Sequence, residues 1–229
     1  KVTIDAVPHY HQSEYPDIRY GNGTIATSGS SVAALAMVAT YMTDHVYTPA
    51  DIADYAVQYG GSHYKRLEKV SDLMQIPWKR ALNVNEALKA VREGKTAIAL
   101  MGPRSVFPGG NHFIVLTGVT EDGKIWVLDP DDRDYSAWGV GELLENGFPD
   151  GKLIAGYEGA WIYDKTQMPE EPFIYEPEPA PEESRYPGLE LTDAERRLVR
   201  MYLMVWRNKL TAQGRDAGPV NDLLIKLMT

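Results

Sequence analysis

Two periods of hydrophobic residues follow one another along the chain. Before about residue 95 apolar residues recur every three or four positions, the period of an α-helix, and after it they form short strand-like runs. The sequence predicts helices over 31–42, 49–57, 64–74 and 83–93, and strands over 96–101, 112–119, 124–128 and 153–163. Helices followed by strands in an antiparallel sheet indicate the α+β class.

Residues that commonly begin or end helices and strands indicate several boundaries of the predicted elements. The segment 31–42 is apolar almost all round, which is typical of a central, buried helix. Asn83 is a suitable N-cap for the helix that follows it, and Gly94 is a suitable stop. Asp122 and Gly123 separate two strand-like runs, so we predict a hairpin turn there.

The composition divides the 229 residues into three zones. Residues 1–165 carry the mixed helix and strand pattern and are enough for one domain. Residues 166–188 hold six prolines and six glutamates against one arginine, which predicts an extended linker or strap. Residues 189–229 predict a C-terminal helical hairpin whose apolar face must be covered, by the first domain, a downstream domain or a second copy.

Composition also excludes several classes of function. No apolar run approaches about 20 residues, so we expect no membrane span. The net charge of −9 makes nucleic acid a poor first guess for a partner. The chain has no cysteine, which excludes disulfides, thiolate zinc sites and a cysteine nucleophile in the sequence as written. It starts at Lys1 without a signal peptide, so we expect a trimmed or mature chain whose leader is gone.

Three polar residues stand where catalytic groups are commonly found. Ser30 opens the buried helix, His112 opens a strand, and Asp129 closes the next strand of the same predicted hairpin. Paired in this way, His112 and Asp129 lie at the same end of adjacent strands, within reach of a hydrogen bond. A nucleophile at a helix N-terminus that faces a histidine oriented by a carboxylate is a catalytic triad. The chain order nucleophile, histidine, aspartate is that of papain-like enzymes, whose nucleophile is cysteine.

The motifs around these residues support that interpretation. They are Val7 to Gln12, Gly23 to Ser31, Ala36-Met37, Asn111-His112-Phe113 to Gly118, and Asp122-Gly123-Lys124 to Asp129-Pro130. Over roughly residues 5–163 the chain resembles papain-like cysteine peptidases related to the bacteriocin-leader-processing peptidases, family thirty-nine of the cysteine peptidases. The resemblance implies a papain-like fold, a bacterial and exported or cell-surface protein, and a peptide or protein substrate.

The resemblance also assigns roles to residues. It implies a triad at Ser30, His112 and Asp129, and makes Gln12 the donor to the oxyanion, with no cofactor and no metal. The chain departs from the family at position 30, where the family has cysteine and this chain has serine. The departure matters because a serine hydroxyl does not form a stable ion pair with the imidazole, as a cysteine thiolate does. We therefore expect hydrolysis of peptide or amide bonds through a thioester in the parent enzyme, and little or no activity in this chain.

Alternatives remain for the protein and for its residues. A deliberate cysteine-to-serine change explains Ser30 most simply, a natural pseudoenzyme comes second and a natural serine variant third. The different function classes are a catalytically dead peptide-binding module and an acyl transferase on the same fold. His9-x-His11 can be a metal pair or surface residues, and the acidic run 129–134 lacks the glycine of a calcium loop. The sequence leaves the cleavage preference and the oligomeric state open.

Overall fold

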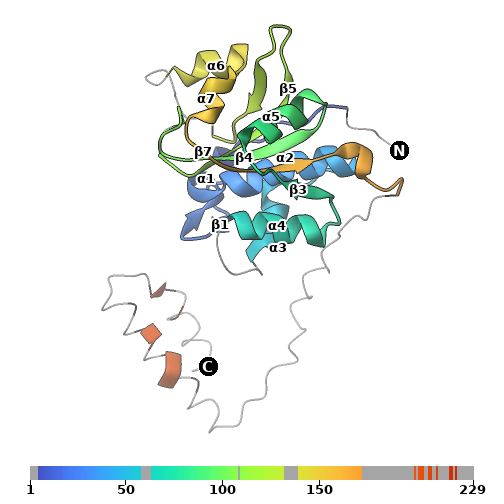
Figure 1. Cartoon of the computed structure of the whole chain (residues 1–229). Helices are drawn as coiled ribbons and strands as arrows, with labels where there is room; N and C mark the ends of the chain where they lie inside the picture. Colours follow the sequence, from blue (N-terminus) through green and yellow to red (C-terminus); the bar gives the residue numbers. More distant parts are fainter. Residues whose placement is uncertain are drawn as a thin grey trace. The chain divides into compact units, whose positions relative to one another are not determined.

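The computed structural model describes residues 5–57, 63–107, 109–131 and 139–171, with scattered positions between 199 and 220 (Figure 1). The chain divides into two compact units, Lys1–Tyr175 and Glu176–Thr229. The boundaries expected at residues 165 and 188 stay predictions, and most of the segment between them, 172–188, lies outside the described residues. None of the helices in the described part is long and apolar enough to cross a membrane.

A layer of helices occupies the N-terminal part of the first unit. It consists of α1 (Ile25–Ser28), α2 (Ser30–Thr43), α3 (Pro49–Val57) and α4 (His63–Leu73). Nearly every residue of α2 is buried, which confirms the prediction of a central helix from its apolar sequence. The helices α3 and α4 pack against α2 and against each other, so the three long helices surround one apolar core.

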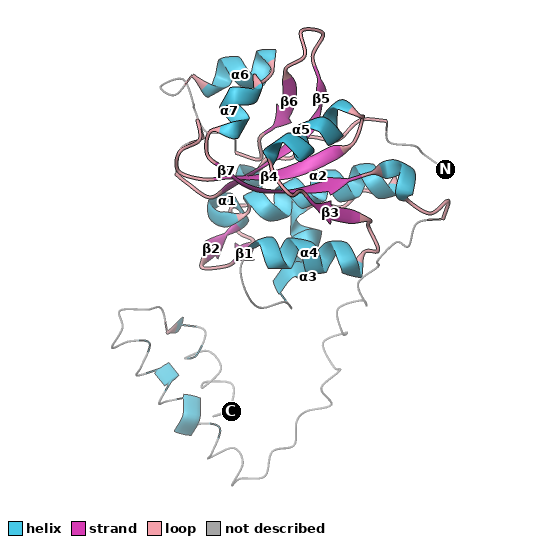
Figure 2. Cartoon of the chain, viewed as in Figure 1, coloured by secondary structure: helices cyan, strands magenta, loops and turns pink. Residues whose placement is uncertain are grey.

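A five-stranded antiparallel sheet follows in the chain (Figure 2). Its strands are β3 (Trp78–Arg80), β4 (Thr96–Met101), β5 (His112–Val119), β6 (Ile125–Leu128) and β7 (Tyr157–Tyr163), in the spatial order β3-β7-β4-β5-β6. A separate two-stranded hairpin is formed by β1 (Arg19–Tyr20) and β2 (Gly23–Thr24). The predicted hairpin between β5 and β6 is present, and Gly123 in its turn has a φ of 84°. The α+β class is confirmed.

Helices cover both faces of the sheet, and Figure 1 shows α2 and α5 (Val84–Arg92) on opposite sides of β4. On one face Ile98 and Trp161 join the core around α2, and on the other Ala97 and Ile162 pack with α5. Burial on both faces explains why the strands read as continuous apolar runs. The side chain of Asn83 caps α5 by accepting a hydrogen bond from the Glu86 N–H at 3.0 Å.

Two parts of the sheet region differ from the prediction. The segment expected to be strand from residue 153 begins as helix α7 (Asp150–Ile154), and β7 starts only at Tyr157. The strand begins after Gly156, which has a φ of 81° and lies so close to Ser105 that a Cβ would be 2.3 Å from its backbone nitrogen. Strand β3 and helix α6 (Val140–Asn146) were not predicted, because elements of three and seven residues are too short to show a clear periodic pattern.

The second unit is described only in part. The described positions from 199 to 210 are helical. Leu203, Leu210 and Val220 are buried together, with Val199 and Ala217 packed against them. The other residues of the predicted helical hairpin lie outside the described residues, so the hairpin and the surface that covers it stay predictions.

Candidate active site

Ser30 is the first residue of α2, and no side chain in the described part of the chain caps the start of this helix. The N-cap is Gly29, which has no side chain to satisfy the first N–H groups of the helix. Only glycine fits here, because a Cβ at Gly29 would lie 2.4 Å from the carbonyl oxygen of Ile25. The N–H groups at the start of α2 and the helix dipole place partial positive charge beside the Ser30 hydroxyl.

His112 and Asp129 come from the open end of the β5–β6 hairpin. The Nε2 of His112 lies 2.5 Å from Oδ1 of Asp129, and both residues are buried. Oδ1 also accepts a hydrogen bond from the Asp131 N–H at 2.9 Å. A carboxylate oxygen that receives two hydrogen bonds acts as an acceptor only, so Nε2 of His112 carries the proton. The predicted contact is present, and the orientation of the imidazole is fixed from one side.

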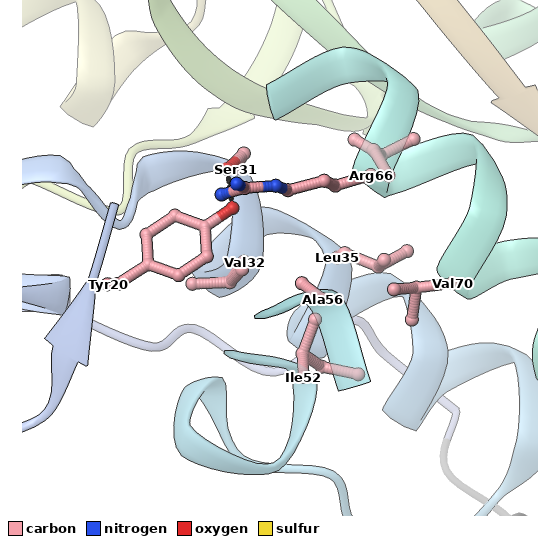
Figure 3. Close-up of a pocket in the computed structure, with 9 residues that line it drawn as sticks. Tyr20, Ser31, Val32, Leu35, Ile52, Ala56, Arg66 and Val70 are labelled. Atoms are coloured by element: carbon pink, nitrogen blue, oxygen red, sulfur yellow. Dashed lines mark hydrogen bonds between the residues drawn. The ribbon is translucent and has the colours of Figure 1, made fainter. Parts of the chain in front are cut away.

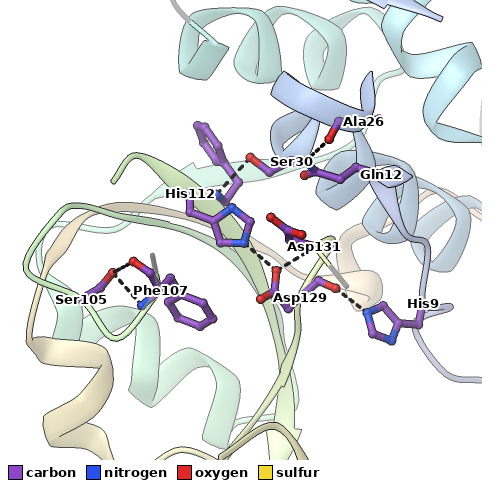
Figure 4. Close-up of polar contacts among 10 residues, drawn as sticks. His9, Gln12, Ala26, Ser30, Ser105, Phe107, His112, Asp129 and Asp131 are labelled. Carbon is purple, nitrogen blue, oxygen red and sulfur yellow. Dashed lines mark hydrogen bonds and ion pairs between the residues drawn. The ribbon is translucent and has the colours of Figure 1, made fainter. Parts of the chain in front are cut away.

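Ser30 lies on the other side of that imidazole. Figure 4 shows the side chains of Ser30 and Asp129 on opposite sides of the His112 ring. The backbone N–H of Phe113 donates to Oγ of Ser30 at 3.4 Å, so the serine hydroxyl is held against the first residues of β5. Nδ1, the ring nitrogen that does not face Asp129, is therefore left as a base for the group at position 30.

Gln12 is brought to the same place from 18 residues upstream of Ser30. It opens the short 3-10 helix Gln12–Glu14 and is buried, with Nε2 donating to the carbonyl oxygen of Ala26 at 2.8 Å. A side-chain amide has two N–H groups, so one remains for an oxyanion beside the Ser30 N–H. Oε1 of Gln12 is buried without a hydrogen-bond partner among the described residues. The position therefore fits the predicted role, which stays a prediction.

The surroundings of His112 and Ser30 are closely packed. The ring of Phe107 lies 5.5 Å from that of His112 and stacks on Phe148 at 5.7 Å, measured between ring centroids. Behind Ser30, the hydroxyl of Tyr20 lies 3.3 Å from that of Ser31, and Arg66 extends toward the pair (Figure 3). Tyr20, Ser31 and Arg66 line a hollow between the helices that leaves no room for a water molecule, so we do not regard it as a substrate pocket.

A metal centre finds no support in the described part of the chain. No group of three or more His, Cys, Asp or Glu side chains is placed there to hold an ion. His9 and His11 lie together, with ring centroids 4.3 Å apart, but the Nε2 of His9 is bonded to the Asp129 carbonyl oxygen at 2.6 Å. The later part of the acidic run, 132–134, lies outside the described residues.

Three polar contacts of the site were not predicted. They are the hydrogen bonds from His9 to Asp129, from Asp131 to Asp129 and from Phe113 to Ser30. The contacts of His9 and of Phe113 join residues 120 and 83 positions apart in the sequence, so no local sequence pattern predicts them. The bond from Asp131 to Asp129 is the one that the sequence could have indicated, because an aspartate commonly accepts a hydrogen bond from the backbone two residues on.

Comparison with known proteins agrees with this geometry. The family model of the Peptidase_C39 like family matches residues 4–139, more than half of the chain. The chain belongs to the Peptidase_C39 like family. The matched range contains Gln12, Ser30, His112 and Asp129, and the papain-like resemblance and fold are thereby confirmed. At the level of the family, the protein is of the cysteine-peptidase type. No curated protein matches the chain.

Proposed function

We propose that the site is an acyl-transfer centre for peptide or amide bonds, and that Ser30 leaves this chain with little or no turnover. The observation that carries the proposal is the 2.5 Å contact between His112 and Asp129 beside the open N-terminus of the helix that bears Ser30. That arrangement supplies a base, a group that orients the base, and donors for an oxyanion at one place.

The chemistry follows from the position of each group. A thiolate at position 30 would attack the substrate carbonyl carbon, and the oxyanion would be held by the N–H of residue 30 and the amide of Gln12. Protonated His112 would give its proton to the leaving amine as the C–N bond breaks and a thioester forms. Water, deprotonated by the same imidazole, would then attack the thioester carbonyl carbon; the C–S bond would break, the acid would leave, and the thiolate would remain beside protonated His112.

Serine at position 30 changes the first step most. A cysteine thiol at a helix N-terminus beside histidine reaches a pKa as low as about 3–4, so its nucleophile is present before substrate binds. A hydroxyl must lose its proton during the attack itself. The N–H of Phe113 donates to the Ser30 oxygen, so it cannot be the acceptor that takes this proton. The protein as written is therefore a peptide-binding form of the enzyme.

The second candidate is a peptide-binding module with no catalytic role. The absence of cysteine from all 229 residues favours it. In either case we propose an exported or cell-surface setting and a peptide or protein partner, on the strength of the family resemblance alone.

The experiment compares the protein with Ser30→Cys, Ser30→Ala and the double variant Ser30→Cys/His112→Ala on a mixed peptide library, with products identified by mass spectrometry. Cleavage by Ser30→Cys that disappears in the double variant supports the proposal, and amide products in the presence of added glycinamide would identify acyl transfer. Peptide binding without any product from Ser30→Cys would favour the binding module. Cleavage by the unaltered protein that Ser30→Ala abolishes would overturn the expected inactivity.

A further inference from the structure

The proposed triad makes no use of His9, yet this residue contacts one of its members. The Nε2 of His9 lies 2.6 Å from the carbonyl oxygen of Asp129, and Figure 4 shows Asp129 between the two imidazoles of His9 and His112. A carbonyl oxygen can only accept, so the His9 ring donates. His9 thus binds the main chain of the residue whose side chain binds His112.

The main chain of Asp129 needs such a donor. Strand β6 ends at Leu128, so Asp129 and Pro130 lie beyond the β5–β6 ladder. Pro130 also has no N–H to donate. The carbonyl groups of these two residues are bonded to the N-terminal segment instead: that of Asp129 to the His9 ring, and that of Pro130 to the Gln12 N–H at 2.8 Å. The segment that carries the proposed oxyanion donor therefore also holds the proposed orienting carboxylate.

We propose that His9 is a positioning residue, which fixes the peptide group after Asp129 and thereby the direction of the carboxylate that orients His112. The proposal rests on the function proposed above, since only then does that direction matter. Oδ1 of Asp129 accepts from both His112 and the Asp131 N–H, so a rotation of the peptide between Asp129 and Pro130 would disturb both bonds. Catalytic groups lose efficiency when they move by about 0.5 Å or more.

Substitutions at position 9 can separate the donor from the ring. His9→Gln keeps an N–H donor at the same number of bonds from Cα, whereas His9→Glu is nearly the same size but cannot donate when ionised. His9→Ala is a second donor-free variant in case His9→Glu folds poorly. His45→Ala is the matched control, because the ring of His45 packs on Tyr47, just after the end of α2 that is opposite to Ser30. Urea unfolding of each variant would report any general loss of stability.

The first readout is the NMR signal of the His112 Nε2 proton, assigned by its loss in Asp129→Ala. We expect this signal to shift or broaden in His9→Glu and His9→Ala, and to be retained in His9→Gln and His45→Ala. The same pattern should appear in the Ser30→Cys background as a loss of thiol alkylation rate of about two- to tenfold at pH 6, the effect of one hydrogen bond. Rescue by glutamine marks positioning, which a loss of packing would not show.

The two proposals can fail separately. If Ser30→Cys shows no enhanced alkylation with His9 intact, the proposed function fails, and the His112 signal alone decides the role of His9. If alkylation is enhanced and neither readout responds to His9→Glu or His9→Ala, the positioning role is wrong and the proposed function stands. If His9→Gln behaves like His9→Glu, donation by the ring is not the cause and the proposal is overturned.

Discussion

Two regions meet at the site, and they are fixed in place by different forces. The helix α2, which carries Ser30, is buried along nearly its whole length in an apolar core. The open end of the β5–β6 hairpin is held by polar groups, among them the bonds of His112, Asp131 and His9 to Asp129. Apolar packing depends on the summed area of many contacts, whereas the polar end depends on a few directional bonds. Substitutions at the buried apolar positions of α2 should therefore change stability, and substitutions at the hairpin end should change chemistry.

The largest effect should come from the packed side. Leu35 in α2 is buried, and we expect Leu35→Ala to lower the free energy of unfolding by about 2–5 kcal/mol through lost burial and a cavity. Leu82→Ala is the matched control, because Leu82 is 88% exposed and should change stability by less than about 0.5 kcal/mol. Urea unfolding measures both. Equal losses in the two variants would show that burial of Leu35 does not stabilise the fold.

At the open end of the β5–β6 hairpin we expect substitutions to change the chemistry of the site. In the Ser30→Cys background, Asp129→Ala removes the acceptor from His112 and should reduce the rate of thiol alkylation at pH 6 by about 10- to 100-fold. Asp122→Ala provides the control, because Asp122 lies in the turn at the other end of the same hairpin, where it bonds to Thr120 and Lys124. An alkylation rate that is the same in both variants would show that the carboxylate does not orient His112.

The packed region also contains a buried phenol, that of Tyr163, whose contribution to stability should depend on pH. The hydroxyl of Tyr163 lies 3.2 Å from that of Ser71, and burial raises the pKa of Tyr163 well above its usual value. The unfolded chain has a tyrosine pKa of about 10, so the stability from the neutral phenol is complete below about pH 10 and falls as the pH rises above it.

Tyr163→Phe should therefore cost about 1 kcal/mol at pH 8, and this difference should shrink at pH 11. Urea unfolding at the two pH values measures it, and Tyr202→Phe is the control because Tyr202 is 65% exposed. A difference that grows between pH 8 and pH 11 would contradict the assigned direction.

The smallest effect lies on the face of the sheet away from α2. Asn83 caps α5, so Asn83→Ala should lower the free energy of unfolding by about 1 kcal/mol and leave thiol reactivity in Ser30→Cys unchanged. Asn85→Ala, inside the same helix at an exposed position, should change stability little, because alanine favours helix. The two midpoints of thermal unfolding test this, and a loss of thiol reactivity in Asn83→Ala would mean that the two sides are coupled.

The same division explains what the sequence could predict. Elements with a long pattern were predicted well, such as α2 from its apolar run and α5 from Asn83 and Gly94. The Ser30, His112 and Asp129 set was visible because each stands at the end of a predicted element and their order matched a family. Short or irregular elements were missed, since β3 is only three residues long and pairs with β7, and the apolar end of α7, Leu153-Ile154, was predicted as the start of a strand. The contact of His9 with Asp129 spans 120 residues, and nothing in the local sequence encodes it.

The most direct test of the account is the pH dependence of thiol alkylation in Ser30→Cys, with Ser30→Cys/His112→Ala as the control. We predict rapid reaction well below pH 8.5, the usual pKa of a cysteine thiol, and the loss of this reactivity without His112. Such a profile would show that the helix N-terminus and the imidazole form a prepared site. A thiol that titrates near pH 8.5 in both variants would contradict the account and leave a binding module as the better description.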